Sequence, residues 1–196
     1  MVNASSIAVR SLMKITCSLP LFSNCRFFVI SLVFLNAKIK YVMKKSVYLD
    51  TTIFSYYVDE RPELGIHIDR TKEWWDKEKH LYDLYLSEFV LLELQRGKFK
   101  KQEEALSLAK EINILEFVDD VKQIVKIYIK NKLMPEMDIG DASHLAYSSF
   151  YKIDVLLTWN CRHLANLNKK GHIKNINQSL GLFVPEIITP LELRME

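Results

Sequence analysis

The stretch VYLDTTIFSYY, residues 47–57, decides the fold that the sequence predicts. It opens with a short apolar run, Val47 to Leu49, which is typical of a strand buried on both faces. The run ends at Asp50, and two threonines then open a helical segment, Ile53 to Val58. A strand that passes directly into a helix is typical of a parallel α/β sheet, in which this acid would lie at the carboxyl end of the strand.

The same alternation continues along the rest of the chain. Apolar runs predict strands at residues 84–86, 114–117 and 155–158, and a short strand between residues 183 and 196. A surface helix is predicted at residues 67–79, where charged residues surround Ile68, Trp74 and Trp75 and the two tryptophans face the core. Another is predicted at residues 88–96, between an N-cap at Ser87 and Gly97. Apolar residues at helical spacing predict helices at residues 105–112, 119–129 and 140–151. Because strands separated by helices pair in parallel, we expect an α/β fold with a central parallel sheet.

The composition is that of a soluble globular protein of one domain. The chain has 196 residues, of which 49% are apolar and 26% are charged. Five Gly and five Pro are too few for a collagenous or low-complexity chain, and three Cys cannot close a disulfide scaffold. We therefore expect a protein of the reducing cytoplasm.

Residues 1–42 differ in charge from the rest of the chain. They hold five of the 27 Lys and Arg residues and none of the 24 Asp and Glu residues, so residues 43–196 carry 22 basic and 24 acidic residues, a net charge of −2. We expect residues 1–42 to lie outside the fold and residues 43–196 to form the domain. The apolar run Phe27 to Leu35 is far shorter than the ~20 residues that a membrane-spanning helix needs, so no membrane association is expected.

Two explanations of this N-terminal extension remain open. Basic residues before the apolar run are compatible with a secretory signal, although the run lies far from the N-terminus. Alternatively, Met43 is the natural start, because Met43-Lys44-Lys45-Ser46 leads straight into the first strand pattern. We favour the second explanation.

Three acids fall where a parallel sheet forms its sites. Asp50 follows a strand, Asp141 begins a helix, and Glu93 lies in a mostly apolar helix. Clustered carboxylates need a neutralising cation, and oxygen ligands suit Mg²⁺ or Mn²⁺. Each acid also has a simpler explanation: Asp50 as a helix cap, Asp141 as a charge favoured by the helix dipole, and Glu93 as a partner of Arg96.

Four runs together resemble the PIN-domain family, and more narrowly the VapC-type toxins of toxin-antitoxin pairs. They are VYLDTTIFSYY (47–57), SEFVLLELQRG (87–97), GDASHLAYS (140–148) and VLLTWNCRHLAN (155–166). The resemblance covers residues 46–193 and implies a three-layer fold with a parallel sheet flanked by helices. It also implies Mg²⁺- or Mn²⁺-dependent cleavage of RNA by an endoribonuclease.

The resemblance assigns roles to individual residues. Asp50, Glu93 and Asp141 match the family's three acids and would bind the metal, and Thr52 would steady Asp50. Glu88 is a rival for the second acid, but it lacks the four-residue spacing to Gly97 that Glu93 has.

The fourth position departs from the commoner pattern. Many relatives have an Asp after the last strand, whereas this chain has Asn160, a neutral amide that we still place in the catalytic set. Asp138, one turn before Asp141, is interpreted as a loop carboxylate or one that supports the metal ligands without binding the metal itself. A degenerate PIN domain that binds RNA or a protein partner without cleavage therefore remains an alternative.

Other motifs carry less weight. A phosphatase of the haloacid-dehalogenase type would need a second Asp where Thr52 stands, and the pair Cys161 and His163 lacks the second pair that a zinc site requires. His144 is interpreted as a packed histidine or one that supports the acids, without a catalytic role.

RNA and protein partners follow from the same resemblance. RNA binding needs cations near the acids, and the candidates are Lys98, Lys100, Lys101 and Arg162, although ordinary solvated surface is an equally good explanation. VapC-type proteins imply a small cognate antitoxin and a homodimer.

Overall fold

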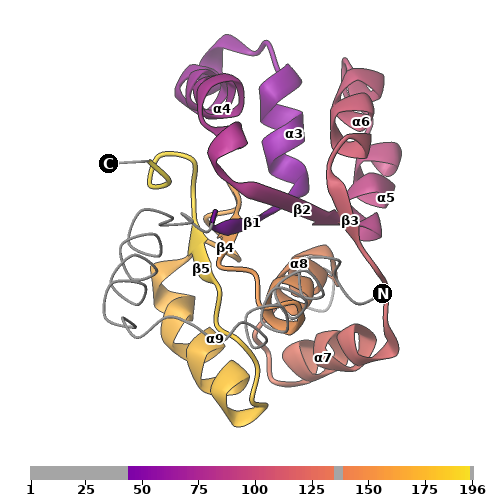
Figure 1. Cartoon of the computed structure of the whole chain (residues 1–196), viewed down its shortest axis with the longest axis vertical. Helices are drawn as coiled ribbons and strands as arrows, with labels where there is room; N and C mark the ends of the chain where they lie inside the picture. Colours follow the sequence, from indigo (N-terminus) through magenta and orange to yellow (C-terminus); the bar gives the residue numbers. More distant parts are fainter. Residues whose placement is uncertain (1–43, 135–138, 195–196) are drawn as a thin grey trace, which may run out of the picture. The chain divides into compact units, whose positions relative to one another are not determined.

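Five short parallel strands form the sheet, in the order β3-β2-β1-β4-β5 (Figure 1). The computed structural model describes residues 44–134 and 139–194. Every neighbouring pair of strands runs parallel. The strands are β1 (Ser46–Leu49), β2 (Asp83–Ser87), β3 (Asn113–Leu115), β4 (Val155–Leu157) and β5 (Glu186–Ile188). The predicted parallel sheet is confirmed, although β3 ends two residues earlier than expected.

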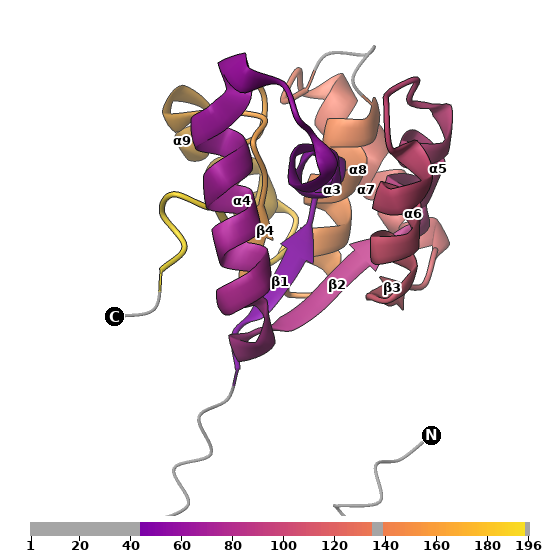
Figure 2. The ribbon, with the colours of Figure 1, turned by 90° about the horizontal axis from the view of Figure 1, so that it is seen from above.

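Helices cover both faces of this sheet and complete three layers (Figures 1 and 2). One face carries α3 (Thr51–Val58), α4 (Gly65–Lys77), α5 (Glu88–Arg96) and α6 (Gln102–Lys110). The other carries α7 (Asp119–Lys130), α8 (Ile139–Phe150) and α9 (Leu167–Ser179). The three-layer α/β fold expected from the sequence is therefore confirmed. None of the helices in residues 44–134 and 139–194 has the length and hydropathy to span a membrane.

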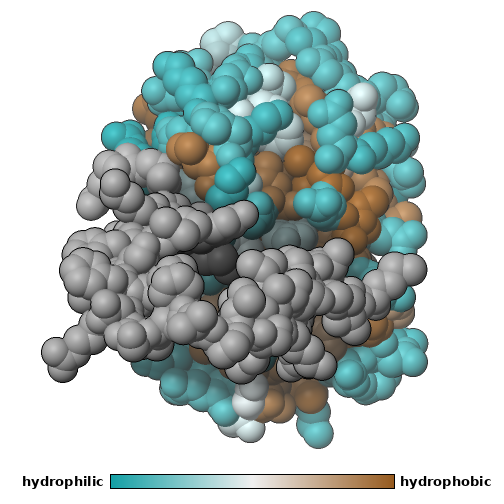
Figure 3. Space-filling model, in the orientation of Figure 1, coloured by the Kyte–Doolittle hydropathy of each residue, from teal (hydrophilic) through white to brown (hydrophobic). Residues whose placement is uncertain are grey.

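The core lies between the sheet and these helices. The apolar side chains of the central strand β1 and of its neighbour β4 are buried, as expected for strands covered on both faces. Trp74 and Trp75 of α4 are buried as predicted. Figure 3 shows the surface in the view of Figure 1, with hydrophilic residues over α4 and hydrophobic residues gathered where β2 and β3 run.

Helix α9 is the element that the sequence did not predict. Only Ile173 and Asn177 are buried along its 13 residues, so it shows little apolar periodicity. Asn177 docks it by polar contacts, because its side chain accepts a hydrogen bond from the Tyr128 hydroxyl at 2.7 Å and donates to Ser149 Oγ at 2.8 Å. A hydrophobic pattern cannot reveal a helix that is fastened in this way.

Two predictions lie outside the described residues. The predicted boundary between residues 42 and 43 lies before residue 44, where the described part of the chain begins. Asp138 lies in residues 135–138, between the two described parts. Both stay predictions.

Candidate active site

Asp50 is fixed at the point where β1 passes into α3. It is the N-cap of α3 and only 3% exposed. Thr52 Oγ1 donates a hydrogen bond to Asp50 Oδ2 at 2.9 Å, and the buried hydroxyl of Thr158, just beyond β4, donates to the same oxygen. The capping role and a role in a site are thus compatible, because the cap directs the carboxylate to the carboxyl edge of the sheet.

Glu93 reaches the same place from α5. The Thr51 hydroxyl donates a hydrogen bond to Glu93 Oε2, which joins α5 to the start of α3. A Cβ on Gly140, at the start of α8, would lie 1.9 Å from Glu93 Oε1. The absence of a side chain at Gly140 is therefore what leaves room for this carboxylate.

His144 of α8 joins the two acids. It is 1% exposed, with Nε2 3.0 Å from Glu93 Oε2 and 3.4 Å from Asp50 Oδ1. Burial alone would lower the pKa of His144, but the negative charges of Asp50 and Glu93 outweigh burial and raise this pKa to about 9. His144 is therefore protonated at neutral pH in the metal-free protein and supplies the positive charge that two adjacent carboxylates require.

The pKa of Glu93 responds to the same contact. Burial works to raise it, but the hydrogen bond and charge of His144, with the Thr51 hydroxyl, lower this pKa below its ordinary value. Glu93 is therefore ionised at neutral pH, as a ligand of a cation must be.

The other ring nitrogen of His144 faces a buried hydroxyl pair. Tyr48 Oη lies 3.0 Å from His144 Nδ1 and 2.6 Å from Ser87 Oγ. Ser87 occupies the predicted N-cap position of α5, but its hydroxyl is bound to Tyr48 and makes no cap hydrogen bond. This chain of contacts fixes the orientation of the imidazole from behind.

Asp141 and Asn160 form the remaining part of the site. The Asn160 amide donates to both carboxylate oxygens of Asp141, at 2.9 and 2.8 Å. Asn160 is itself held, since its backbone N–H donates to Thr158 Oγ1 and its side-chain oxygen accepts from the His163 backbone N–H. Asp141 lies three residues before His144 on α8, and its charge contributes to the raised pKa of His144.

The donor set fits a divalent cation. Asp50, Glu93 and His144 each offer a ligand atom within 4.8 Å of the others. Carboxylate oxygens suit Mg²⁺ or Mn²⁺, and Asp141 supplies a third carboxylate beside this group. We treat His144 as a partner of the carboxylates, because its Nε2 already contacts Glu93.

The sequence left His144 between a packing role and one that supports the acids, and the structure shows that it contacts both Asp50 and Glu93; Thr158 was not predicted as part of the site. The signal for His144 was its position three residues after Asp141, which places both on one face of a helix. Thr158 gave no signal, because the pairing of β1 with β4 is what brings its hydroxyl to Asp50.

The four cationic residues predicted to bind RNA differ in their partners and in their distance along the chain from the site residues. Lys100 and Lys101 both pair with Glu60, beyond the far end of α3 from Asp50. Arg162 is exposed, two residues after Asn160, and Lys98 is exposed in the loop after α5. Of the four, Arg162 follows a site residue most closely in the chain, whereas Lys100 and Lys101 are engaged elsewhere.

Comparison with known proteins identifies the family. The family model of the PIN domain matches residues 47–168, which include Asp50, Glu93, Asp141 and Asn160. A comparison with curated protein sequences finds no match.

Two similar solved structures come from bacteria. One is a toxin-antitoxin complex from Klebsiella pneumoniae, with 15% identity, a TM-score of 0.50, and coverage of 75% of this chain and 99% of that chain. The other is VapC20 of Mycobacterium tuberculosis, described as a toxin that cleaves the sarcin-ricin loop, with 12% identity, a TM-score of 0.48, and coverage of 60% and 92%. At 15% identity the structure from Klebsiella pneumoniae shows the similarity of fold alone. The family assignment rests instead on the PIN domain model, which matches more than half of the chain. The chain belongs to the PIN domain family.

Proposed function

We propose that this protein is a metal-dependent endoribonuclease that hydrolyses phosphodiester bonds in RNA. The observation that carries the proposal is the convergence of Asp50 and Glu93, from two different elements, on one point at the carboxyl edge of the sheet. Membership of the PIN domain family supports it. The site residues expected from the sequence, Asp50, Glu93, Asp141 and Asn160, are the ones we propose for catalysis.

Mg²⁺ or Mn²⁺ would be held by Asp50, Glu93 and Asp141. When bound, such a cation lowers the pKa of water and stabilises negative charge on phosphoryl oxygens. The chain's own contribution is orientation: Thr52 and Thr158 hold Asp50, and Asn160 holds both oxygens of Asp141. Hydrolysis of this kind needs no side-chain nucleophile, so we assign none.

We further propose that the protein is the toxin of a toxin-antitoxin pair. The similar structure from Klebsiella pneumoniae is a toxin-antitoxin complex, and the match covers 99% of the compared chain of that structure. A small cognate antitoxin is then the expected protein partner. The homodimer expected from the resemblance stays a prediction.

The direct test is cleavage of a mixed RNA pool by the full chain in Mn²⁺, Mg²⁺ or EDTA. We expect cutting with either metal, none in EDTA, and none by the Asp141→Asn variant. Asp154→Asn is the matched control, because Asp154 is an acid bound to Ser46 at the opposite edge of the sheet. Cutting that persists in EDTA or in Asp141→Asn would contradict the proposal.

The second candidate function is RNA or protein binding without cleavage. The observation that favours it is Asn160, which gives Asp141 an amide partner where many relatives have a further acid. A folded, antitoxin-free protein that binds RNA but cuts none in either metal would establish this alternative. Asn160→Asp would then be the variant to test for recovered cleavage.

A further inference from the structure

Three aromatic rings gather beside the carboxylates. Tyr56 of α3 stacks on His67 of α4, with ring centroids 5.4 Å apart and planes inclined at 23°. Trp159, which follows β4, meets both rings edge-on, with its centroid 4.5 Å from that of His67 and 5.9 Å from that of Tyr56. We call these three residues the aromatic cluster.

The aromatic cluster is joined to the site by direct contacts. The backbone N–H of Trp159 donates to Thr52 Oγ1 at 3.0 Å, and the same hydroxyl donates to Asp50. Tyr56 lies four residues after Thr52 on α3, one helical turn of about 5–6 Å along the helix. The cluster therefore begins about one helical turn from the residue that holds Asp50.

The cluster has a fixed base and an accessible outer part. Trp159 is 8% exposed, and its indole N–H donates to the buried Thr71 hydroxyl at 2.7 Å. Tyr56 and His67 are only partly buried. Within the described part of the chain, neither the Tyr56 hydroxyl nor the ring nitrogens of His67 form a hydrogen bond, so these polar edges are available to a ligand.

The neighbouring Tyr57 shows the contrast. Its hydroxyl donates to Asp76 at 3.0 Å, and its ring packs against Trp75 of the core. Both rings are partly buried against the core, but the Tyr57 hydroxyl is bound within the fold, whereas the Tyr56 hydroxyl forms no hydrogen bond in the described part of the chain. A nucleobase has the same combination of a π-face and hydrogen-bonding edges.

We propose that Tyr56 and His67 form a stacking surface for one unpaired base of the RNA whose backbone reaches the carboxylates. This inference rests on the proposed function and adds to it the place where one base of the RNA would bind. A base inside a duplex cannot reach the surface, because its faces are covered by its neighbours.

The test is binding of fluorescein-labelled 12-nucleotide single-stranded RNAs, one of A and one of U, to the full chain in EDTA, so that binding is measured without cleavage. Tyr56→Leu should weaken binding about five- to a hundredfold, because it removes the π-face. Tyr56→Phe, which keeps the face, should bind within about threefold of the wild-type chain. Tyr57→Leu is the matched control and should have little effect on binding.

A second measurement follows RNA binding in the wild-type chain itself. In the wild-type chain, RNA should shift the indole N–H NMR signal of Trp159, assigned with Trp159→Phe, and leave that of Trp74, which is fully buried, in place. An unchanged Trp159 signal at saturating RNA would overturn the proposal.

The outcomes separate this inference from the nuclease proposal. Unchanged affinity in a folded Tyr56→Leu variant overturns the stacking surface, even if the wild-type chain cuts RNA. So does equal loss of affinity for a duplex of the same length. Weakened single-strand binding in Tyr56→Leu supports the surface, even if no RNA is cut and the nuclease proposal fails.

Discussion

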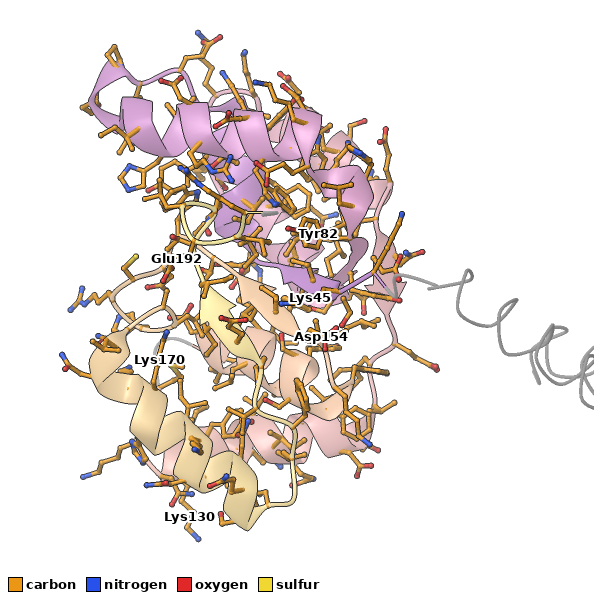
Figure 4. All side chains as sticks on the ribbon, turned by 60° about the vertical axis from the view of Figure 1, so that its left-hand side comes forward. Lys45, Tyr82, Lys130, Asp154, Lys170 and Glu192 are labelled. Carbon is orange, nitrogen blue, oxygen red and sulfur yellow. The ribbon has the colours of Figure 1, made fainter. Side chains whose placement is uncertain are left out.

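A carboxylate accepts hydrogen bonds from hydroxyl groups at both the amino edge and the carboxyl edge of the sheet, where the strands begin and end, but the two contacts differ in their surroundings. At the amino edge lies the exposed Asp154, which is labelled in Figure 4. Its carboxylate accepts hydrogen bonds from the backbone N–H and the hydroxyl of Ser46, at 2.9 and 2.7 Å. At the carboxyl edge, the buried Asp50 accepts from the hydroxyls of Thr52 and Thr158. Both contacts tie β1 to the region of β4. Among residues 44–134 and 139–194, a group of two carboxylates and a histidine within ligand distance of one another is found at the carboxyl edge alone, where the chain passes from strands into helices.

The largest difference between the two edges is expected when Asp50 and Asp154 are each replaced by Asn. Asp50→Asn should reduce RNA cleavage about a thousandfold, since even the outer partners of a metal site cost about ten- to a hundredfold. Asp154→Asn should leave the rate within about twofold. Single-turnover cleavage with Mn²⁺ measures both. Equal losses in the two variants would show that the edges do not differ in function.

The pH dependence of stability is the next largest effect. Because the pKa of His144 in the fold is about 9, above its ordinary 6.5, His144 stabilises the metal-free protein fully below pH 6.5. This contribution should be lost as pH rises through 9, by at most about 3 kcal/mol. The pKa of Glu93 is lowered below its ordinary 4.5, so the stability that Glu93 contributes is lost only in acid, as pH falls below 4.5.

Urea unfolding in EDTA from pH 6 to 10 measures the His144 effect. The wild-type chain should lose stability across this range more steeply than His144→Gln, whose curve should be flatter. If the two curves fall in parallel, the ion pair at the carboxyl edge is not what sets the slope.

Two glycines, Gly140 beside Glu93 and Gly171 in α9, test how much room the site leaves for an added methyl group. Gly140→Ala should reduce cleavage about tenfold or more, because the new Cβ would displace the Glu93 carboxylate from its position. Gly171→Ala in α9 has open space around its Cβ and should be neutral, or stabilising by up to about 1 kcal/mol. Cleavage rates and thermal unfolding of the pair distinguish local displacement from general damage. A fully active Gly140→Ala would mean that Glu93 tolerates movement.

The smallest effect is expected at the amino edge. Ser46→Ala removes the hydroxyl that bonds to Asp154 and also accepts from the Asp154 backbone N–H. Because the pair is exposed, unfolding free energy should fall by only about 1 kcal/mol, with cleavage unchanged. Urea denaturation with a parallel cleavage assay checks this. A large loss of activity would show that the two edges are coupled through β1.

Much of the fold could be predicted from local patterns. The five strands and six of the helices follow from apolar runs and helical spacing, because burial between layers imposes those patterns. Helix α9 could not be predicted, since Asn177 fastens it by hydrogen bonds that leave no periodic trace. Similarly, Lys100 and Lys101 could not be told from site cations until Glu60 was placed against them.

The sequence by itself determined the α/β class and the candidate acids, because strand-to-helix junctions and the spacing within one helix are local properties. Tertiary structure decided which groups meet. The pairing of β1 with β4 brings Thr158 to Asp50, and the approach of α8 to α5 brings His144 to Glu93. The aromatic cluster was hidden for the same reason: Tyr56 and His67 belong to the successive helices α3 and α4, Trp159 follows the distant strand β4, and the three become neighbours only when these elements pack together.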